Sequence, residues 1–337
     1  MKRYMQKIMT IQTAAKVIKI SLGSCIAIMI ASAAGLQYSA SAGIITLLSI
    51  QDTKKATLQV AGKRAAAFLA ALAAAYACFK LMGFTPAAFG VFLLLFVTVC
   101  IVMELQDGIS MCAVLVTHFL VEQSMSVYWI RNELLLMMIG TGIGILLNMY
   151  IPGYVKQIRM HQQYIELEMR LLLKGSATYL RDREGRFQLA YDFGILDTKV
   201  DQALKQAYEE RDNNLGTGYT YFIKYMEMRR SQIVVLKHMI GQLMMLKGHP
   251  VQRVRVAALI EDILLTFRES NNAVRLLESL NVMKMGFKEQ PLPEHRQEFE
   301  DRAILYGIMN SLEQFLEFKK YFADDLTMEE KNTFWTG

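Results

Sequence analysis

Apolar residues gather in six blocks within the first 152 positions, and short polar breaks separate these blocks. A helix of about 20 apolar residues crosses the hydrocarbon core of a bilayer, so blocks approaching this size predict transmembrane helices. The second block is the shortest and covers only about half of the core. We predict six membrane helices, in chain order Ala14–Ala34, Ala40–Ile50, Ala65–Met82, Ala87–Met103, Ile109–Val121 and Leu134–Tyr150.

The pattern changes after Pro152, where apolar and charged positions recur at helical spacing. This pattern is typical of amphipathic helices that bury one face in a bundle. We predict an all-α chain with a six-helix transmembrane domain over residues 1–152 and a cytoplasmic helical bundle over residues 153–337. The bundle helices are expected near 154–182, 196–212, 219–247, 251–284 and 296–324, with breaks at 184–194, 213–218, 247–250 and 289–295.

The formal net charge of +6 lies wholly in residues 1–152, because residues 153–337 contain equal numbers of basic and acidic side chains. The basic residues flank the predicted membrane helices, so they indicate cytoplasmic loops rather than a nucleic-acid surface. Basic clusters at 2–19, 54–64 and 156–159 place both termini in the cytoplasm. Tyr128 and Trp129 are then expected at the outer interface. The first apolar block imitates a signal peptide, but more apolar blocks follow, so we expect it to be retained.

A candidate pathway mouth follows the short second block. Asp52 comes directly after it and is expected below the headgroups, where a carboxylate needs a partner or a wet cavity. The nearby positive charges would attract organic anions. The alternative is that the bases are ordinary cytoplasmic anchors and that Asp52 caps a helix. The candidate residues are Gln51, Asp52, Thr53, Lys54, Lys55, Lys63 and Arg64.

A second acidic turn lies on the same predicted side of the membrane. MELQDG (Met103–Gly108) joins the fourth and fifth blocks and carries Glu104 and Asp107. Opposite charges from these two inner loops would form a gate. The alternative is a solvated turn or a purely structural ion pair, and ion pairs alone do not establish transport.

His118 is the one histidine within a predicted membrane helix, and Glu122 follows it one helical turn later. A histidine there can relay protons, because its charge changes near neutral pH. It can equally be a neutral, hydrogen-bonded residue near the outer interface. One His/Glu pair does not make a zinc site, which takes three or four protein ligands.

The remaining motifs favour packing over chemistry. GTGIG (Gly140–Gly144) lies inside a predicted helix, so we interpret it as a close helix contact and not as a dinucleotide loop. The four cysteines lie in apolar runs without metal spacing, and we expect them to be small buried hydrophobes. The sequence has no P-loop, nucleophile elbow or HExxH motif. We therefore expect no enzyme activity, no cofactor and no metal. Any active transport must then draw its energy from an ion gradient or from a partner.

The segment AGIITLLSIQDTKKATLQVAGKRAAAFLAALAA (Ala42–Ala74) joins a helix of small residues, a polar turn and a basic stretch that enters an alanine-rich helix. In this order it resembles the aromatic acid exporter family, which is related to the fusaric acid resistance proteins. The turn here reads LLSIQDT. In many relatives it is similar to LLSLQPT, with proline at the position of Asp52. The stretch after Pro152 is similar to the C-terminal domain that accompanies the family in Gram-positive bacteria.

The resemblance implies export of small aromatic carboxylates across the bacterial plasma membrane, without settled functional residues. Larger relatives hold two membrane halves in one chain, so a single half implies a homodimer in the bilayer. The first hypothesis is therefore a proton-coupled exporter of small organic anions, with no nucleic-acid partner. The alternative is a non-transporting membrane sensor or scaffold whose cytosolic bundle binds a partner.

Overall fold

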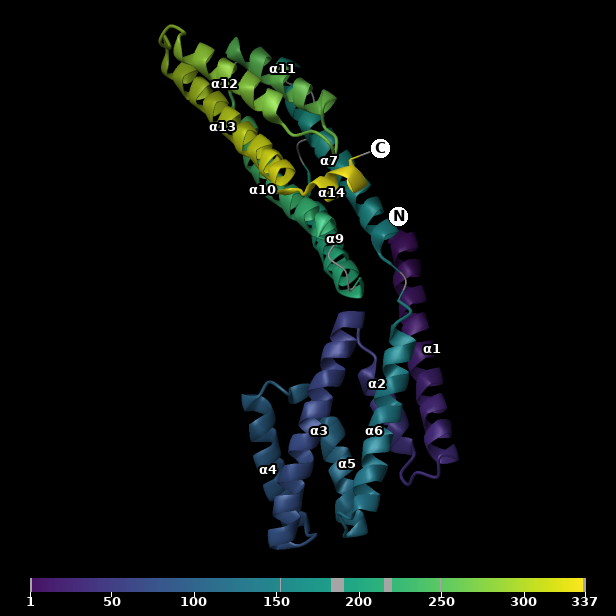
Figure 1. Cartoon of the computed structure of the whole chain (residues 1–337). Helices are drawn as coiled ribbons and strands as arrows, with labels where there is room; N and C mark the ends of the chain where they lie inside the picture. Colours follow the sequence, from purple (N-terminus) through teal and green to yellow (C-terminus); the bar gives the residue numbers. More distant parts are fainter. Residues whose placement is uncertain (1, 152, 183–190, 215–219, 249, 336–337) are drawn as a thin grey trace. The chain divides into compact units, whose positions relative to one another are not determined.

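The computed structural model describes residues 2–151, 153–182, 191–214, 220–248 and 250–335. All regular secondary structure in this part of the chain is helical, as predicted (Figure 1). Internal contacts divide the chain into two compact units, Met1–Pro152 and Gly153–Gly337, called here the N-terminal and C-terminal units. The predicted breaks at 184–194, 213–218 and 247–250 fall partly outside the described residues.

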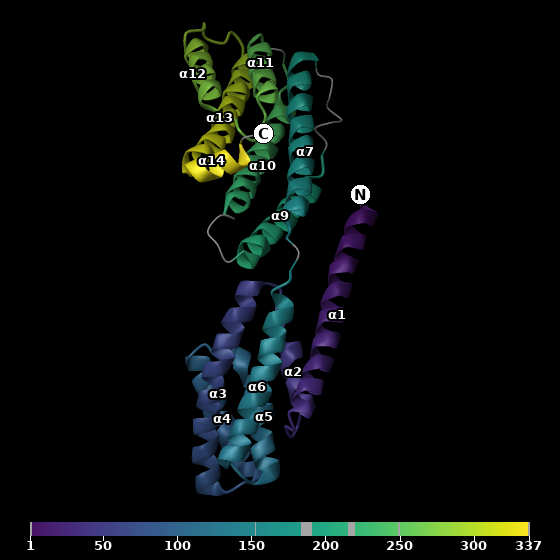
Figure 2. The same cartoon turned by 45° about the vertical axis from the view of Figure 1, so that its right-hand side comes forward.

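In the N-terminal unit, α1, α2 and α6 pack together, and so do α3, α4 and α5 (Figure 2). Contacts of α3 with α6 and of α2 with α5 join the two groups. The helices are α1 (Lys2–Ala33), α2 (Ala40–Ser49), α3 (Lys54–Met82), α4 (Pro86–Val102), the 3-10 helix η1 (Gln106–Gly108), α5 (Ile109–Glu122) and α6 (Val127–Asn148).

Three helices of this unit are long and apolar enough to cross a membrane: the Lys16–Ala33 part of α1, α3 and α6. α2 and α4 are apolar but shorter, and α5 has 14 residues. All six predicted helices are therefore present, whereas six membrane crossings remain a prediction.

Three predicted helix starts in this unit were wrong. α1 begins at Lys2 and not at Ala14. α3 begins at Lys54 and not at Ala65, because Thr53 caps it with a hydroxyl that accepts a hydrogen bond from the Ala56 N–H at 3.2 Å. α6 begins at Val127 and not at Leu134. Because α6 starts earlier, Glu133 lies within a helix that is long and apolar enough to cross a membrane.

Two glycines set the contact between α6 and α2. A Cβ added at Gly140 would lie 2.6 Å from the Ala42 carbonyl oxygen, and one at Gly144 would lie 2.5 Å from the Ser49 Cβ. Both distances are shorter than a normal van der Waals contact, so only glycine permits this approach. The predicted packing role of GTGIG is confirmed.

The C-terminal unit is a bundle in which α10 packs against α7, α9 and α13. Tyr221, Tyr225 and Arg229 of α10 are almost fully buried there. The helices are α7 (Val155–Asp182), α9 (Phe193–Asn213), α10 (Tyr221–Met245), α11 (Gln252–Leu265), α12 (Val274–Lys288), α13 (Arg296–Asp325) and α14 (Met328–Phe334).

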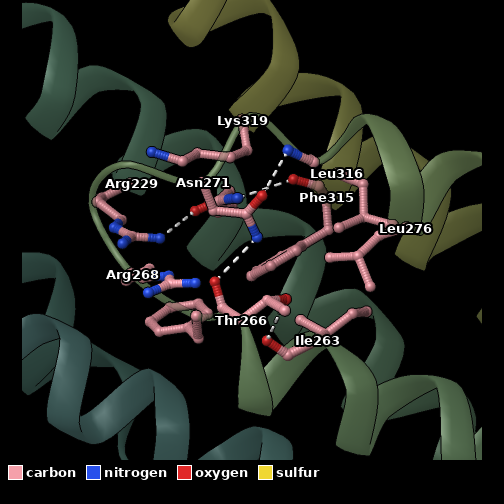
Figure 3. A pocket seen from close by; sticks show the side chains of 12 residues that line it. Arg229, Ile263, Thr266, Arg268, Asn271, Leu276, Phe315, Leu316 and Lys319 are labelled. Carbon is pink, nitrogen blue, oxygen red and sulfur yellow. Dashed lines mark hydrogen bonds between the residues drawn. The ribbon is translucent and has the colours of Figure 1, made fainter. Parts of the chain in front are cut away.

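The prediction of a single helix over 251–284 was wrong. α11 ends at Leu265 and α12 begins at Val274. Asn271 holds the intervening loop, since its Nδ2 donates to the Thr266 carbonyl and its Oδ1 accepts from the Ala273 N–H, both at 2.8 Å. The loop lines a small cavity together with residues of α10 and α13 (Figure 3).

Candidate functional site

Arg64 joins three elements at one end of the N-terminal unit. Its guanidinium donates to the Ser49 hydroxyl at 2.9 Å, to the Leu48 carbonyl at 2.9 Å and to the Asp107 carbonyl at 3.0 Å. The side chain is only 5% exposed. Two of its acceptors lie in the last turn of α2, where a cation is favourable. Arg64 therefore fixes the end of α2 against α3 and η1.

Asn148 holds the segment that joins α2 to α3. Its Nδ2 donates to the Gln51 carbonyl at 2.9 Å and to the Thr57 hydroxyl, which itself donates to the Thr53 carbonyl at 2.9 Å. Sequence reasoning missed Asn148, although an amide near the end of an apolar helix is a signal for such a contact. Gln51 thus contributes its backbone carbonyl to this contact. Thr53 contributes its carbonyl and the hydroxyl that caps α3.

Charged residues of the predicted mouth pair with other charged side chains. Asp52 pairs with Lys16 of α1 at 2.6 Å, and Lys63 pairs with Asp107 at 3.7 Å. Lys16 was not among the candidate residues of the predicted mouth, and this pair adds it to them. The predicted meeting of the two loops occurs between Lys63 and Asp107. All four side chains are substantially exposed.

The remaining candidate residues at this end of the unit are Lys54, Lys55 and Glu104. Lys54 and Lys55 form the first turn of α3. Glu104 is exposed and has φ of 57°, in the left-handed region that ends the turn after α4. Asp52 precedes the true N-cap, Thr53, so it does not cap α3.

A buried polar cluster lies elsewhere in the same unit, around His118 of α5. His118 Nδ1 lies 2.7 Å from Glu133 Oε2, and its Nε2 lies 3.3 Å from the Ser41 hydroxyl of α2. Glu133 is 0% exposed and His118 is 7% exposed. Asn132 donates to Glu133 Oε1 at 3.0 Å and also bonds the Gln37 backbone. Three helices thus supply one hydrogen-bonded cluster.

Tyr38 covers this cluster. Its ring stacks on the His118 ring with centroids 4.1 Å apart and planes 5° apart, and its hydroxyl donates to Glu122 Oε1 at 2.7 Å. The predicted pairing of His118 with Glu122 is therefore indirect, and the direct partner is Glu133. Sequence reasoning missed Glu133 because α6 was predicted to begin one residue after it.

The arrangement can exchange a proton between a buried carboxylate and an imidazole. Among the described residues, no three His, Cys, Asp or Glu side chains gather as a metal site requires. Cys78, Cys100 and Cys112 are buried as predicted, whereas Cys25 is exposed.

Comparisons with known proteins agree on one family. Residues 11–151 match the model "Aromatic acid exporter family member 1", and residues 156–320 match "Putative aromatic acid exporter C-terminal domain". The "Uncharacterized protein YqjA" of Bacillus subtilis (strain 168) is 29% identical over 307 residues, which cover 91% of this chain and 95% of the relative.

One solved structure is also similar in sequence. It is the crystal structure of a "putative membrane protein from Clostridium difficile 630", with 27% identity and a TM-score of 0.43. The match covers 50% of this chain and 98% of the solved chain.

Proposed function

The chain belongs to the aromatic acid exporter family, and on this premise we propose that it exports small aromatic carboxylates or related organic anions from the bacterial cytoplasm, as a homodimer driven by the proton gradient. The family is one of membrane exporters, and three helices of the N-terminal unit have the length and composition for the bilayer. In this proposal all six helices cross the membrane, and the C-terminal unit lies in the cytoplasm.

The buried His118–Glu133 pair is the observation that carries the proton-coupling part of the proposal. Ionisable groups are rare in membrane helices because they are costly there, and they commonly mark proton or substrate pathways. Histidine changes charge near neutral pH, and a carboxylate 2.7 Å away can accept or return its proton. In our proposal the pair takes up a proton from outside and releases it inside as an anion leaves.

The exposed charges at the other end serve substrate entry in the same proposal. Lys54, Lys55 and Lys63 raise the local positive potential, which increases the local concentration of organic anions. The Lys16–Asp52 and Lys63–Asp107 pairs open and close as gates, with Glu104 beside them. Arg64 holds the surrounding backbone in place through its three hydrogen bonds.

Uptake of labelled 4-hydroxybenzoate into inverted membrane vesicles tests this proposal, with a proton gradient imposed and vesicles without the protein as the blank. Glu133→Gln keeps the shape of the side chain and removes its charge, so we expect it to abolish gradient-driven uptake at equal expression. Lys80→Gln is the control, because it removes an exposed charge of the same unit that belongs to neither the buried cluster nor the gate. It should retain most of the uptake.

The outcomes separate the parts of the proposal. Uptake that Glu133→Gln leaves unchanged would remove the buried pair from the coupling mechanism. Uptake equal to the blank for a panel of aromatic acids would remove export itself. For the gate, Asp52→Asn should slow uptake, and exchanging the charges in Lys16→Asp with Asp52→Lys should restore it in part.

A further inference from the structure

Tyr38 lies in the turn between α1 and α2, at the same end of the N-terminal unit as the turn between α5 and α6 (Figure 2). Its backbone has φ of 56°, in the left-handed region, which is unfavourable for a residue with a large side chain. Such a conformation persists only where the surrounding contacts require it, and it often marks a functional site. The fold thus accepts backbone strain in order to place this side chain.

Hydrogen bonds fix the backbone on both sides of Tyr38. Before it, Asn132 of α6 accepts from the Gln37 N–H at 2.9 Å and donates to the Gln37 carbonyl at 3.1 Å. After it, the Ser41 N–H of α2 donates to the Tyr38 carbonyl at 2.9 Å. Because these bonds hold the backbone, the ring can leave its position by rotation of the side chain while the turn stays folded.

The Tyr38 ring covers one face of the His118 imidazole. The two rings are almost parallel, with centroids 4.1 Å apart and planes 5° apart. Rings at this spacing are in van der Waals contact, so no water reaches that face of the imidazole. Glu133, which lies 2.7 Å from His118 Nδ1, is also buried. Removal of the Tyr38 ring would therefore open the buried pair to solvent on this side.

A hydrogen bond near the surface holds the ring in this position. The Tyr38 hydroxyl donates to Glu122 Oε1 at 2.7 Å, and Glu122 is exposed. A hydrogen bond to a carboxylate is stronger than one between neutral groups. This bond is the main cause that raises the pKa of Tyr38 to about 12, so the hydroxyl keeps its proton and remains a donor at neutral pH. The Tyr38–Glu122 bond, called here the latch, thus fastens the ring over the imidazole.

We propose that Tyr38 is a lid over the buried His118–Glu133 pair, and that the pair exchanges a proton with solvent only when the Tyr38 side chain rotates away. The role of the lid in transport rests on the proposed function, in which the pair carries the coupling proton and this end of the unit faces outward. The closed lid then keeps protons from leaking through the protein when no anion is carried, and the latch sets how often the lid opens.

Thiol labelling measures lid opening without transport. Ser41→Cys places a thiol where the Ser41 hydroxyl lies 3.3 Å from His118 Nε2, at a position that is 6% exposed. Cys25→Ser removes the exposed cysteine, whereas the other three cysteines are buried. We would measure the rate at which a charged, water-soluble methanethiosulfonate labels the full-length protein in detergent, with the Cys25→Ser protein as the blank. An open state populated at about 10% or less predicts slow labelling while Tyr38 is present.

Three variants separate the lid from its latch. Tyr38→Ala removes the lid and should raise the labelling rate by about tenfold or more, because the site is then always open. Tyr38→Phe keeps the stacked ring and loses the latch, so it should raise the rate by several fold, and Glu122→Ala should have the same effect. Tyr128→Ala is the control, because Tyr128 is an exposed tyrosine that packs on the neighbouring Trp129. It should label as the wild type does.

A proton leak tests the role of the lid in coupling. Proteoliposomes with a trapped pH-sensitive dye would receive a pH gradient and no organic acid. Tyr38→Ala should dissipate the gradient faster than the wild type. Adding Glu133→Gln to this variant should restore the wild-type rate, because the pair then no longer passes a proton.

Equal labelling rates for the wild type and Tyr38→Ala would overturn the proposal. So would an equal rise for Tyr128→Ala, because it would indicate a general loosening of this end of the unit. If Tyr38→Ala does not fold, the two latch variants decide the question, and unchanged labelling in both would overturn the lid. Faster labelling without a faster leak would remove the lid from coupling. Faster labelling with blank-level uptake of aromatic acids would support the lid and remove the exporter, so the two proposals fail separately.

Discussion

Replacing Lys319 by methionine should make the C-terminal unit more stable at neutral pH and should remove a pH dependence that the lysine imposes. Lys319 is packed against the rings of Tyr225, Phe322 and Trp335, and burial is the main cause that lowers its pKa from 10.5 to about 7. The unfolded chain keeps the higher pKa, so between pH 7 and 10.5 it binds more protons than the folded chain. Stability therefore rises with pH in this window.

The magnitude follows from the same two values. At about 1.36 kcal/mol per pH unit, the full cost of burying the charged lysine is about 5 kcal/mol below pH 7, and about 2 kcal/mol of it is relieved between pH 7 and pH 9. Methionine fills a similar volume without the charge. The free energy of unfolding of Lys319→Met should thus exceed that of the wild type most at pH 7, and the gap should narrow by about 2 kcal/mol at pH 9.

Urea unfolding of the full-length protein in detergent measures this, with Trp335 emission as the signal in a Trp129→Phe background. The difference between wild type and variant cancels other titrating groups, such as His161, whose pKa also falls through burial. Lys320→Met is the control, and its difference from the wild type should not change with pH. A Lys319→Met difference that stays constant from pH 7 to pH 9 would refute the reasoning.

Two further variants test the packing of the N-terminal unit by thermal unfolding in detergent. Gly140→Ala should destabilise by about 1–3 kcal/mol, because the new Cβ would lie 2.6 Å from the Ala42 carbonyl, whereas nothing lies within 4 Å of a Cβ at Gly142. Gly142→Ala should be near neutral, and equal effects at both positions would contradict the predicted close approach. Arg64→Met should lower the free energy of unfolding by about 3 kcal/mol, because it leaves buried acceptors unpaired. Lys63→Met, at a more exposed site, should lower it by well under 1 kcal/mol. Similar losses for the two variants would contradict the structural role of Arg64.

The helices of both units could be predicted from the sequence because apolar periodicity reports local burial. Two boundaries failed where a polar group decided them. Thr53 starts α3 early through its hydroxyl, and Asn271 ends a predicted helix by bonding backbone groups on both sides. α14 was missed although Thr327 and Glu330 form a capping box, a signal visible in the sequence.

The site was predicted less well, because its pairs join distant positions. Asp52 meets Lys16 across 36 residues, and His118 meets Glu133 across 15. Sequence spacing suggested Glu122 for His118, since residues one turn apart share a helix face. In the structure Tyr38 links the two residues, because its ring stacks on His118 and its hydroxyl donates to Glu122. Tyr38 comes from the turn before α2, and the sequence of α5 gives no signal for this contact.

The unequal lengths of the helices in the N-terminal unit have a consequence for the surrounding lipid. At 1.5 Å per residue, the 29 residues of α3 measure about 44 Å, whereas the 10 of α2 measure about 15 Å and the 14 of α5 about 21 Å. In the proposed arrangement, in which all six helices cross a hydrocarbon layer of about 30 Å, the bilayer would have to deform or admit headgroups above the short helices. The acyl-chain length of the host membrane would then set the elastic strain around this protein.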